Sequence, residues 1–321
     1  MKQKFIILMI CVLVGGGVAA GWYKGYLADF LANYPVRQPL QVSLPNYQMM
    51  GMAHRVDTLD APENTIAAIH SALAKGADYL EIDIRLASDG VPVLFHDSTV
   101  DRTTKHSGPV KQFSSAELTA MDAGSWFGEQ FSDQRVPLLA DALREIQGKA
   151  CVMADIKGNI NRKTILLLKE FYDPAKPHCL LIVLVSNQPL GEWLADLPAE
   201  AQQIANSNKK GIVAVFDRQY AEFRRYWPGF PYVRQFSVGN TLEEVFEQYP
   251  SVVAIKTMPG SADDEMIDRM REEGLFVYTL LYGRSEESLP KIFSESAQKG
   301  LHGLLLADIK ALDEFQAEAQ R

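Results

Sequence analysis

Short apolar segments alternate with longer amphipathic segments along this 321-residue chain from about residue 48 onward. Most of the apolar segments are continuous rather than alternating, as expected of parallel strands that are buried on both faces. The amphipathic segments have the spacing of helices that cover such strands. About eight strand–helix repeats favour an α/β fold of the (β/α)8 TIM barrel type over a doubly wound sheet. No glycine-rich nucleotide-binding motif follows any strand, which removes support from the doubly wound alternative.

The predicted strands and helices can be placed in the sequence. The strand candidates lie at 50–55, 79–86, 91–97, 150–157, 179–185, 211–216, 252–257, 275–281 and 303–308. The helix candidates include 65–75, 138–146, 164–171, 242–248, 263–273 and 289–299.

One predicted strand breaks the parallel order. The segment 91–97 follows 79–86 too soon for a crossover helix, so we predict an antiparallel hairpin that turns at residues 88–90. Residues 97–136 then form a polar, glycine-containing insertion before the next helix. We see no linker after residue 48, so a single catalytic domain over 48–321 is the simplest organisation.

The beginning of the chain has a different character. Lys2 and Lys4 precede an apolar run at 5–20, which has the order of an export signal. Trp22 and Tyr23 follow this run, and such aromatic side chains suit the surface of a membrane. With them the span approaches the roughly 20 residues that cross a bilayer as a helix.

We therefore expect a signal or anchor segment at 1–27, in the form of an N-terminal apolar helix, and a linker at 28–47. Three consecutive glycines argue against a buried core helix. We favour an uncleaved anchor over cleavage after Ala20. The catalytic domain would then be exported and face the periplasm or the extracellular side, or be secreted if the segment is cleaved.

The charge balance limits the partners of the chain. The sequence has 40 Asp and Glu against 32 Lys and Arg, a formal net charge of -8. This acidity argues against a nucleic-acid partner and against loose adsorption to anionic lipid. We predict a small-molecule substrate and contact with a membrane through the N-terminal segment alone.

Polar residues gather at the predicted strand ends, where barrels carry their catalytic groups. Glu81 and Asp83 point to the same face of their strand, and two buried carboxylates need a compensating cation. A hard divalent cation is the natural partner, and buried salt bridges with Arg55, Arg85 or Lys157 are the alternative. The gathered residues are His54, Arg55, Glu81, Asp83, His96, Asp155 and Lys157.

This set of groups suits the cleavage of a phosphodiester. Two histidines can serve as general acid and general base near neutral pH. Three carboxylates can hold a metal ion, and Arg55 and Lys157 supply positive charge for an anionic substrate.

Longer stretches of the sequence resemble the glycerophosphodiester phosphodiesterase family. Their order and spacing agree with that family over roughly residues 50 to 310. The resemblance implies a TIM-barrel phosphodiesterase with a small inserted subdomain after the second strand and one divalent metal ion, Mg²⁺ or Ca²⁺. The matching stretches are AHR at 53–55, PENT at 62–65, GADYLEIDIRLASDGVPVLFHD at 76–97, VDRTT at 100–104, MDAGSWF at 121–127, ADIKG at 154–158 and GLLLAD at 303–308.

The resemblance also implies roles for individual residues. Glu63 and Asn64 would brace the first loop, and Asp97 would hold a histidine or the adjoining loop. Tyr278 stands where the family often has a tryptophan that lines the glycerol pocket. The principal roles fall on His54 and His96 as catalytic residues, on Glu81, Asp83 and Asp155 as metal ligands, and on Arg55 and Lys157 as phosphate-binding residues.

Three positions depart from the family pattern. Val56-Asp57 follows His54-Arg55 where the family normally has glycine, and a β-branched residue disfavours the dihedral angles that glycine permits. We therefore expect the first loop to run differently. Asp155 replaces the usual glutamate and is one methylene shorter, which would weaken the metal site or recruit water. The last strand has Leu306-Ala307 before Asp308 where threonine is common.

The leading prediction is metal-dependent hydrolysis of glycerophosphodiesters to glycerol phosphate and an alcohol. An anchored enzyme could also act on lysophospholipids as a lysophospholipase D. The three departures motivate another class of function, a membrane-tethered phosphodiester-binding protein with reduced or no turnover. A phosphatidylinositol-type phospholipase fits the PENT and VDRTT stretches less well. The sequence leaves open which histidine is the acid and whether a cyclic phosphate forms.

Two cysteines begin predicted neighbouring strands. Cys151 and Cys179 could pair in an oxidising compartment, but disulfide geometry across parallel strands is restrictive. We therefore expect two buried thiols.

Overall fold

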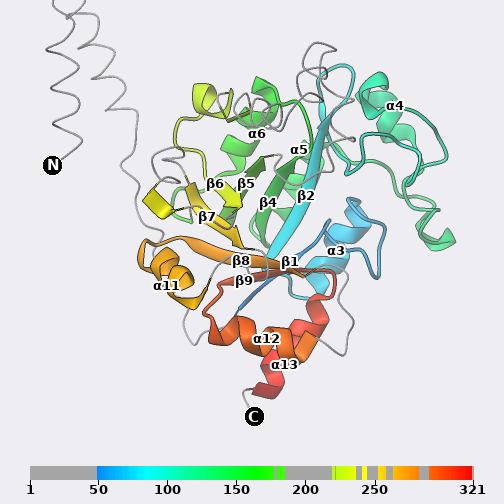
Figure 1. Cartoon of the computed structure of the whole chain (residues 1–321). Helices are drawn as coiled ribbons and strands as arrows, with labels where there is room; N and C mark the ends of the chain where they lie inside the picture. The colour runs from blue at the N-terminus through cyan, green and yellow to red at the C-terminus, as the bar shows by residue number, and fades with distance from the viewer. Residues whose placement is uncertain are drawn as a thin grey trace, which may run out of the picture. The chain divides into compact units, whose positions relative to one another are not determined.

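A computed structural model describes residues 49–176, 179–184, 219–220, 222–235, 241–243, 252–257, 263–281 and 289–319. Within these residues, parallel strands form a closed ring with helices outside it (Figure 1). The order β1-β9-β8-β7-β6-β5-β4-β2 is closed by pairing of β1 with β2, which confirms the predicted TIM barrel. The barrel strands are β1 (Met50–Ala53), β2 (Tyr79–Leu86), β4 (Cys151–Ile156), β5 (Leu180–Leu184), β6 (Tyr232–Gln235), β7 (Val252–Thr257), β8 (Phe276–Leu281) and β9 (Gly303–Leu306).

The predicted hairpin is confirmed. Strand β3 (Pro92–Leu94) runs antiparallel to β2, with Ile84 opposite Leu94 and Leu86 opposite Pro92. Gly90 turns the chain with φ 73°, a left-handed conformation that glycine adopts at little cost. The hairpin extends β2 beyond the ring and leads into the insertion.

The helices begin where polar side chains cap their first turns. The Thr65 side chain accepts a hydrogen bond from the Ala68 amide, and Asn161 does the same for Thr164. The barrel helices are α3 (Ile66–Ala74), α5 (Leu139–Ile146), α6 (Arg162–Phe171), α11 (Asp264–Glu272), α12 (Leu289–Gln298) and α13 (Ile309–Ala319). Their buried faces pack against the outward side chains of the strands and form the larger core.

The inside of the ring is packed with large side chains. Alternation along the strands turns Tyr79, Met153, Phe276 and Tyr278 inward with their neighbours in one apolar cluster. Glu81 and Asp83 follow Tyr79 on the same face of β2, two and four residues nearer its C-terminal end. The apolar interior therefore supports a polar layer at the end of the barrel where the strands finish.

The insertion after β3 has a core of its own. Val100, Val110, Leu118 and Met121 pack with Phe95 in a cluster separate from the barrel cores. Its elements are η2 (Val110–Gln112), α4 (Ser115–Ala120) and η3 (Glu129–Phe131). Figure 1 shows α4 outside the ring of strands. The insertion is thus a small packed subdomain rather than an open loop.

Some predicted segments cannot be compared with the structure, and one strand of the barrel was not predicted. The strand predicted at 211–216, the signal or anchor segment at 1–27 and the linker at 28–47 lie outside the described residues. Strand β6 at Tyr232–Gln235 was not predicted, and it fills the place in the ring between β5 and β7. Across the part of the chain that the structure describes, no helix has the length and apolar character needed to cross a membrane.

The prediction of two buried thiols is wrong. Cys151 and Cys179 form a disulfide with their Cα atoms 4.3 Å apart. The cause lies in the strand register, which pairs Val152 of β4 with Leu180 of β5. The residues that precede this pair, Cys151 and Cys179, are therefore brought directly opposite each other.

Candidate active site

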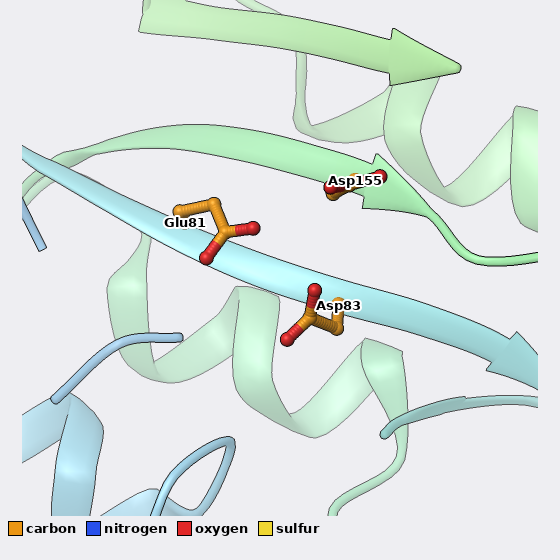
Figure 2. A group of neighbouring side chains, drawn as sticks. All are labelled: Glu81, Asp83 and Asp155. Atoms are coloured by element: carbon orange, nitrogen blue, oxygen red, sulfur yellow. The ribbon is translucent and has the colours of Figure 1, made fainter. Parts of the chain in front are cut away.

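Three carboxylates from two adjacent strands lie close together. Glu81 and Asp83 come from β2 and Asp155 from β4, as Figure 2 shows. The register pairs Asp83 with Asp155, and one ligand atom from each of the three side chains lies within 4.8 Å of the others. Glu81 and Asp83 are buried, and Asp155 is half-buried.

The electrostatics of this cluster favour a bound cation. Burial raises the pKa of Glu81 well above its usual value, and the Asp83 charge raises it further. Burial alone would also raise the pKa of Asp83, but Lys157 and then His96 lower it below its usual range. Ligand oxygens so arranged suit a hard divalent ion, whose positive charge would offset the repulsion between the Glu81 and Asp83 carboxylates.

Lys157 already neutralises part of the cluster. Its Nζ lies 2.7 Å from Asp155 Oδ2 and 3.1 Å from Asp83 Oδ1. Burial would lower the pKa of Lys157, but Asp155 and Asp83 raise it above its usual value. The alternative of buried salt bridges is therefore realised at Lys157, while Glu81 accepts from the Arg55 backbone amide at 2.6 Å.

The loop after β1 is shaped for the site. Arg55 and Val56 have φ of 50° and 74°, in the left-handed region. We expected Val56 to force another path, and instead it takes the type of conformation that glycine favours, at a cost of order 1–3 kcal/mol. The neighbouring Asp57 secures the loop to α3, because its carboxylate accepts from Ser71 and Lys75 at 2.6 Å each.

Asn64 connects this loop to β2. Its side chain donates to Asp83 Oδ2 at 2.6 Å and accepts from the Asp83 amide at 3.1 Å. Its own backbone amide donates to the Arg55 carbonyl at 3.1 Å. Asn64 therefore orients Asp83 within the cluster and fixes the loop that carries His54.

His54 lies at the end of β1, beside the cluster. Burial and the positive charge of Arg55 lower its pKa to about 3, while Asp83 acts in the opposite direction. The imidazole is consequently neutral at pH 7 and has an electron pair with which to accept a proton. Its backbone amide donates to the Leu306 carbonyl at 3.0 Å, which ties the loop to β9.

His96 is held from two sides. Its Nδ1 lies 2.6 Å from Asp97 Oδ1, and because a carboxylate only accepts, Nδ1 carries the proton. Its carbonyl accepts from Arg85 Nε at 2.9 Å. The Asp97 contact orients the ring and leaves Nε2 for exchange of a proton with a substrate.

Arg102 links the two histidine loops, and no role was predicted for it. Its guanidinium donates to Asp97 Oδ2 at 2.6 Å and to Glu63 Oε1 at 2.6 Å. Glu63 in turn lies 3.3 Å from the Arg55 guanidinium. The hydrogen bond with Glu63 is the largest of the interactions that raise the pKa of Arg102 above its usual value. Hydrogen bonds with His96 and Arg102 keep the pKa of Asp97 below its usual range, although burial alone would raise it.

The far side of the barrel adds two more polar side chains. Tyr278 on β8 is fully buried, and burial with the nearby Asp155 and Glu81 raises its pKa well above the usual value. Among the described residues, no group forms a hydrogen bond with the Tyr278 hydroxyl. Lys256 on β7 pairs in register with Tyr278, and burial lowers its pKa although Asp155 and Glu81 oppose this.

The structure thus brings all the sequence-predicted site residues to one end of the barrel. Tyr278, which was predicted to line the glycerol pocket, is fully enclosed, as is Asp83. Arg102 and Lys256 were missed. Arg102 lies within VDRTT, where nothing local indicates a bridge, and Lys256 ends an apolar strand as a surface lysine often does.

Known proteins share the part of the sequence that forms this site. Residues 54–183 match the glycerophosphoryl diester phosphodiesterase family, and this span includes every ligand of the carboxylate cluster. This part of the chain is therefore similar to members of that family. The chain is 39% identical to glycerophosphodiester phosphodiesterase 1 of Mus musculus over 172 residues, 51% of this chain and 52% of that protein. It is 42% identical to a glycerophosphodiester phosphodiesterase of Caldanaerobacter subterraneus over 127 residues, 37% of this chain and 52% of the relative.

Several solved phosphodiesterase structures have the same fold as this chain. A glycerophosphodiester phosphodiesterase from Agrobacterium tumefaciens has a TM-score of 0.66 at 23% identity, covering 83% of this chain and 100% of its own. A phosphodiesterase from Oleispira antarctica, solved with the product sn-glycerol-3-phosphate, has a TM-score of 0.61 at 21% identity, covering 86% and 98%. The chain spans about half the length of the curated relatives it matches.

Proposed function

We propose that this chain is a divalent-metal-dependent phosphodiesterase that hydrolyses glycerophosphodiesters to glycerol phosphate and an alcohol. The convergence of Glu81, Asp83 and Asp155 within 4.8 Å, beside two histidines and a buried lysine, is the observation that carries the proposal. The family match supports it, as does the fold likeness to an enzyme solved with glycerol phosphate.

Glu81, Asp83 and Asp155 would hold one metal ion, Mg²⁺ or Ca²⁺. The ion supplies Lewis acidity and positive charge at a phosphoryl oxygen. Asp155, although shorter than glutamate, stays within the cluster, so its reach does not exclude it as a ligand. Lys157 offsets part of the negative charge of the cluster through its contacts with Asp83 and Asp155, and its ammonium would also attract an anionic phosphate.

His54 is the base in this proposal. Its imidazole is neutral at pH 7 because burial and Arg55 lower its pKa to about 3. It accepts the proton of the attacking oxygen, from water or from the glycerol hydroxyl, while a new P–O bond forms. Both nucleophiles give the same final products, since a cyclic phosphate would later be opened by water.

His96 is the acid. As the P–O bond to the alcohol breaks, the leaving oxygen takes a proton from Nε2 of His96, whose ring is fixed by Asp97 at Nδ1. Arg55 and Lys157 stabilise the charge that develops on the phosphate oxygens. The resulting proton balance is closed when His54 returns its proton to solvent and His96 regains one.

The direct test is turnover by the purified full-length chain. Glycerophosphocholine hydrolysis should require Mg²⁺ or Ca²⁺, stop with chelator and resume on readdition of metal. Calorimetry should show metal binding that Asp83→Asn weakens by at least tenfold, whether or not turnover is seen. Tight diester binding without turnover of any diester would contradict the proposal and favour the binding-protein alternative.

A lysophospholipid substrate is the second candidate. Leu59 and Trp126 are 50% and 41% exposed, and they belong to the first loop and to the insertion. Exposed apolar side chains at a barrel mouth suit a substrate with an acyl chain. Lysophosphatidylcholine should then be cleaved faster than glycerophosphocholine, and Leu59→Ser with Trp126→Ser should reverse this preference.

We also propose that the segment 1–27 exports the domain and anchors it in a membrane. Its basic start and apolar run at 5–20 support this. Fractionation of cells that express the full chain should place it in the membrane fraction, accessible to protease from the outer side. A chain found in the soluble fraction after processing behind Ala20 would instead support a cleaved signal.

A further inference from the structure

A cationic pocket lies beside the carboxylate cluster. It has a volume of about 280 Å³ and is formed by the β2–β3 hairpin, the insertion and the segment after β4. We call it the Arg85 pocket. Its lining residues are Arg85, Leu86, Ala87, Ser88, Gly90, Ser98, Val110, Lys111, Lys157 and Asn159.

The charge of this pocket has one sign. Among the described residues that line it, three are basic and none is acidic. Arg85 and Lys157 are buried at its inner end, and Lys111 is exposed at its rim. Lys157 contacts Asp83 and Asp155 of the cluster, whereas Arg85 and Lys111 add positive charge to the part of the pocket formed by the hairpin and the insertion.

The acidic residue nearest in the hairpin is directed elsewhere. Asp89 stands between two lining residues, but its Oδ2 accepts from Ser115 Oγ at 2.7 Å and from the Ser115 amide at 3.1 Å. Ser88, Ser98 and Asn159 add small polar groups to the lining. The pocket therefore offers positive charge and hydrogen-bonding groups in a space that suits a small anionic group.

The position of the pocket relates it to the leaving group. Arg85 donates to the carbonyls of both His96 and Lys157, and Ser98 is two residues beyond His96. His96 is the residue that would protonate the departing alcohol. These contacts are with the backbone next to the His96 side chain, so an alcohol released beside His96 would lie near the Arg85 pocket, with the glycerol phosphate at the carboxylate cluster.

We propose that the Arg85 pocket binds the alcohol part of the diester and favours alcohols that carry a carboxylate or a phosphate. This inference rests on the proposed function and adds a substrate class to it. The anionic group lies between Arg85 at the inner end and Lys111 at the rim. Diesters with a neutral or cationic alcohol occupy the catalytic site without this contact.

A matched pair of diesters tests the proposal. Glycerophosphoserine and glycerophosphoethanolamine differ by one carboxylate, and their affinities for His54→Ala protein with Mg²⁺ can be compared by calorimetry. We expect about fivefold tighter binding of the serine diester, the usual strength of a partly exposed ion pair. Adding Lys111→Met should abolish this preference, and adding Lys111→Arg should keep it.

Lys105→Met is the matched control, because Lys105 is an exposed lysine of the same insertion that pairs with Asp122 outside the pocket. It should leave the preference unchanged. Equal binding of the two diesters, or a preference that survives Lys111→Met, would overturn the pocket assignment. Turnover by the unmodified protein is scored separately. A binding preference without turnover contradicts only the proposed function, and turnover without a preference contradicts only the pocket.

Discussion

The two halves of the barrel differ in what they place inside the ring. Strands β1 to β4 and their loops carry both histidines and all three carboxylates, whereas β5 to β9 turn mainly apolar side chains inward. Among the described residues of the second half, Lys256 and Tyr278 lie near the cluster, and both are buried. The family match at 54–183 ends within β5, so sequence likeness is concentrated in the half that carries the chemistry.

Catalytic and structural roles can therefore fall on different strands of one closed barrel. The second half completes the barrel and supplies the wall opposite the cluster, which needs shape and apolar surface more than particular reactive groups. If this division is real, substitutions in the first half should reduce turnover far more than those in the second half.

Loss of a histidine should have the largest effect. We expect His54→Ala to lower kcat by about 1,000-fold, since proton transfer by a positioned group typically contributes 100- to 10,000-fold. His70→Ala is the control, because His70 lies exposed on α3 and pairs with Glu145 away from the site. Steady-state kinetics measure both. A loss below tenfold for His54→Ala would remove it from the proton-transfer role.

A buried histidine of the second half should act on stability instead. His302 Nδ1 accepts from the Val277 amide at 3.0 Å, and burial followed by Arg271 lowers its pKa from 6.5 to about 4. The unfolded chain takes up a proton below pH 6.5 while the folded chain does not. Folding stability is therefore lost as pH falls from 6.5 to about 4, by at most about 3 kcal/mol.

Denaturant titrations across this pH range measure the effect. His302→Asn keeps an acceptor and cannot titrate, so its stability should depend less on pH. Part of the dependence will remain, because the pKa of His54 is lowered as well. An unchanged pH dependence in His302→Asn would contradict the expectation, and an unchanged kcat at pH 7.5 would support the separation of tasks.

Arg102 tests whether the first half works as one connected unit. Arg102→Ala frees Asp97 and Glu63 together, so His96 and Arg55 both lose support, and we expect kcat to fall by about tenfold or more. Guanidinium ion in solution should restore part of kcat, which a defect of folding would not allow. Arg135→Ala, an exposed arginine of the same insertion that bonds to backbone carbonyls, should be silent.

Lys256 should give the smallest change. Lys256→Met removes a positive charge near Asp155 and Glu81, so Mg²⁺ should bind about threefold more tightly by calorimetry, with kcat altered less than fivefold. Lys291→Met on the exposed face of α12 serves as the control. A loss of kcat comparable with that of His54→Ala would contradict this division of roles and would make Lys256 a catalytic residue of the second half.

Most of the barrel could be predicted from sequence because its strands are long apolar runs. β6 escaped because its four residues include Arg234 and Gln235, which interrupt the apolar pattern. The predicted site residues lie at strand ends or in motifs, where spacing along the chain determines the shared face. Arg102 could not be found this way, because its partner Glu63 lies 39 residues away and only the folded loops bring them together.

The first loop shows another limit of sequence reasoning. Val56 was expected to exclude the conformation that glycine adopts, because propensity describes the isolated residue. In the folded chain Val56 is fully buried, and Asp57 is held by Ser71 and Lys75 on α3. Tertiary contacts thus compensate for the local strain.

The bond between Cys151 and Cys179 joins β4 to β5, where the two halves meet, and it has a practical consequence. Cross-linking residues 28 positions apart stabilises a fold by about 3.6 kcal/mol in the chain-entropy account. A cytosolic expression host keeps thiols reduced, whereas an oxidising compartment lets them pair. Preparations of the same sequence can therefore differ by two hydrogen atoms and melt at different temperatures, so the production route decides which form is assayed.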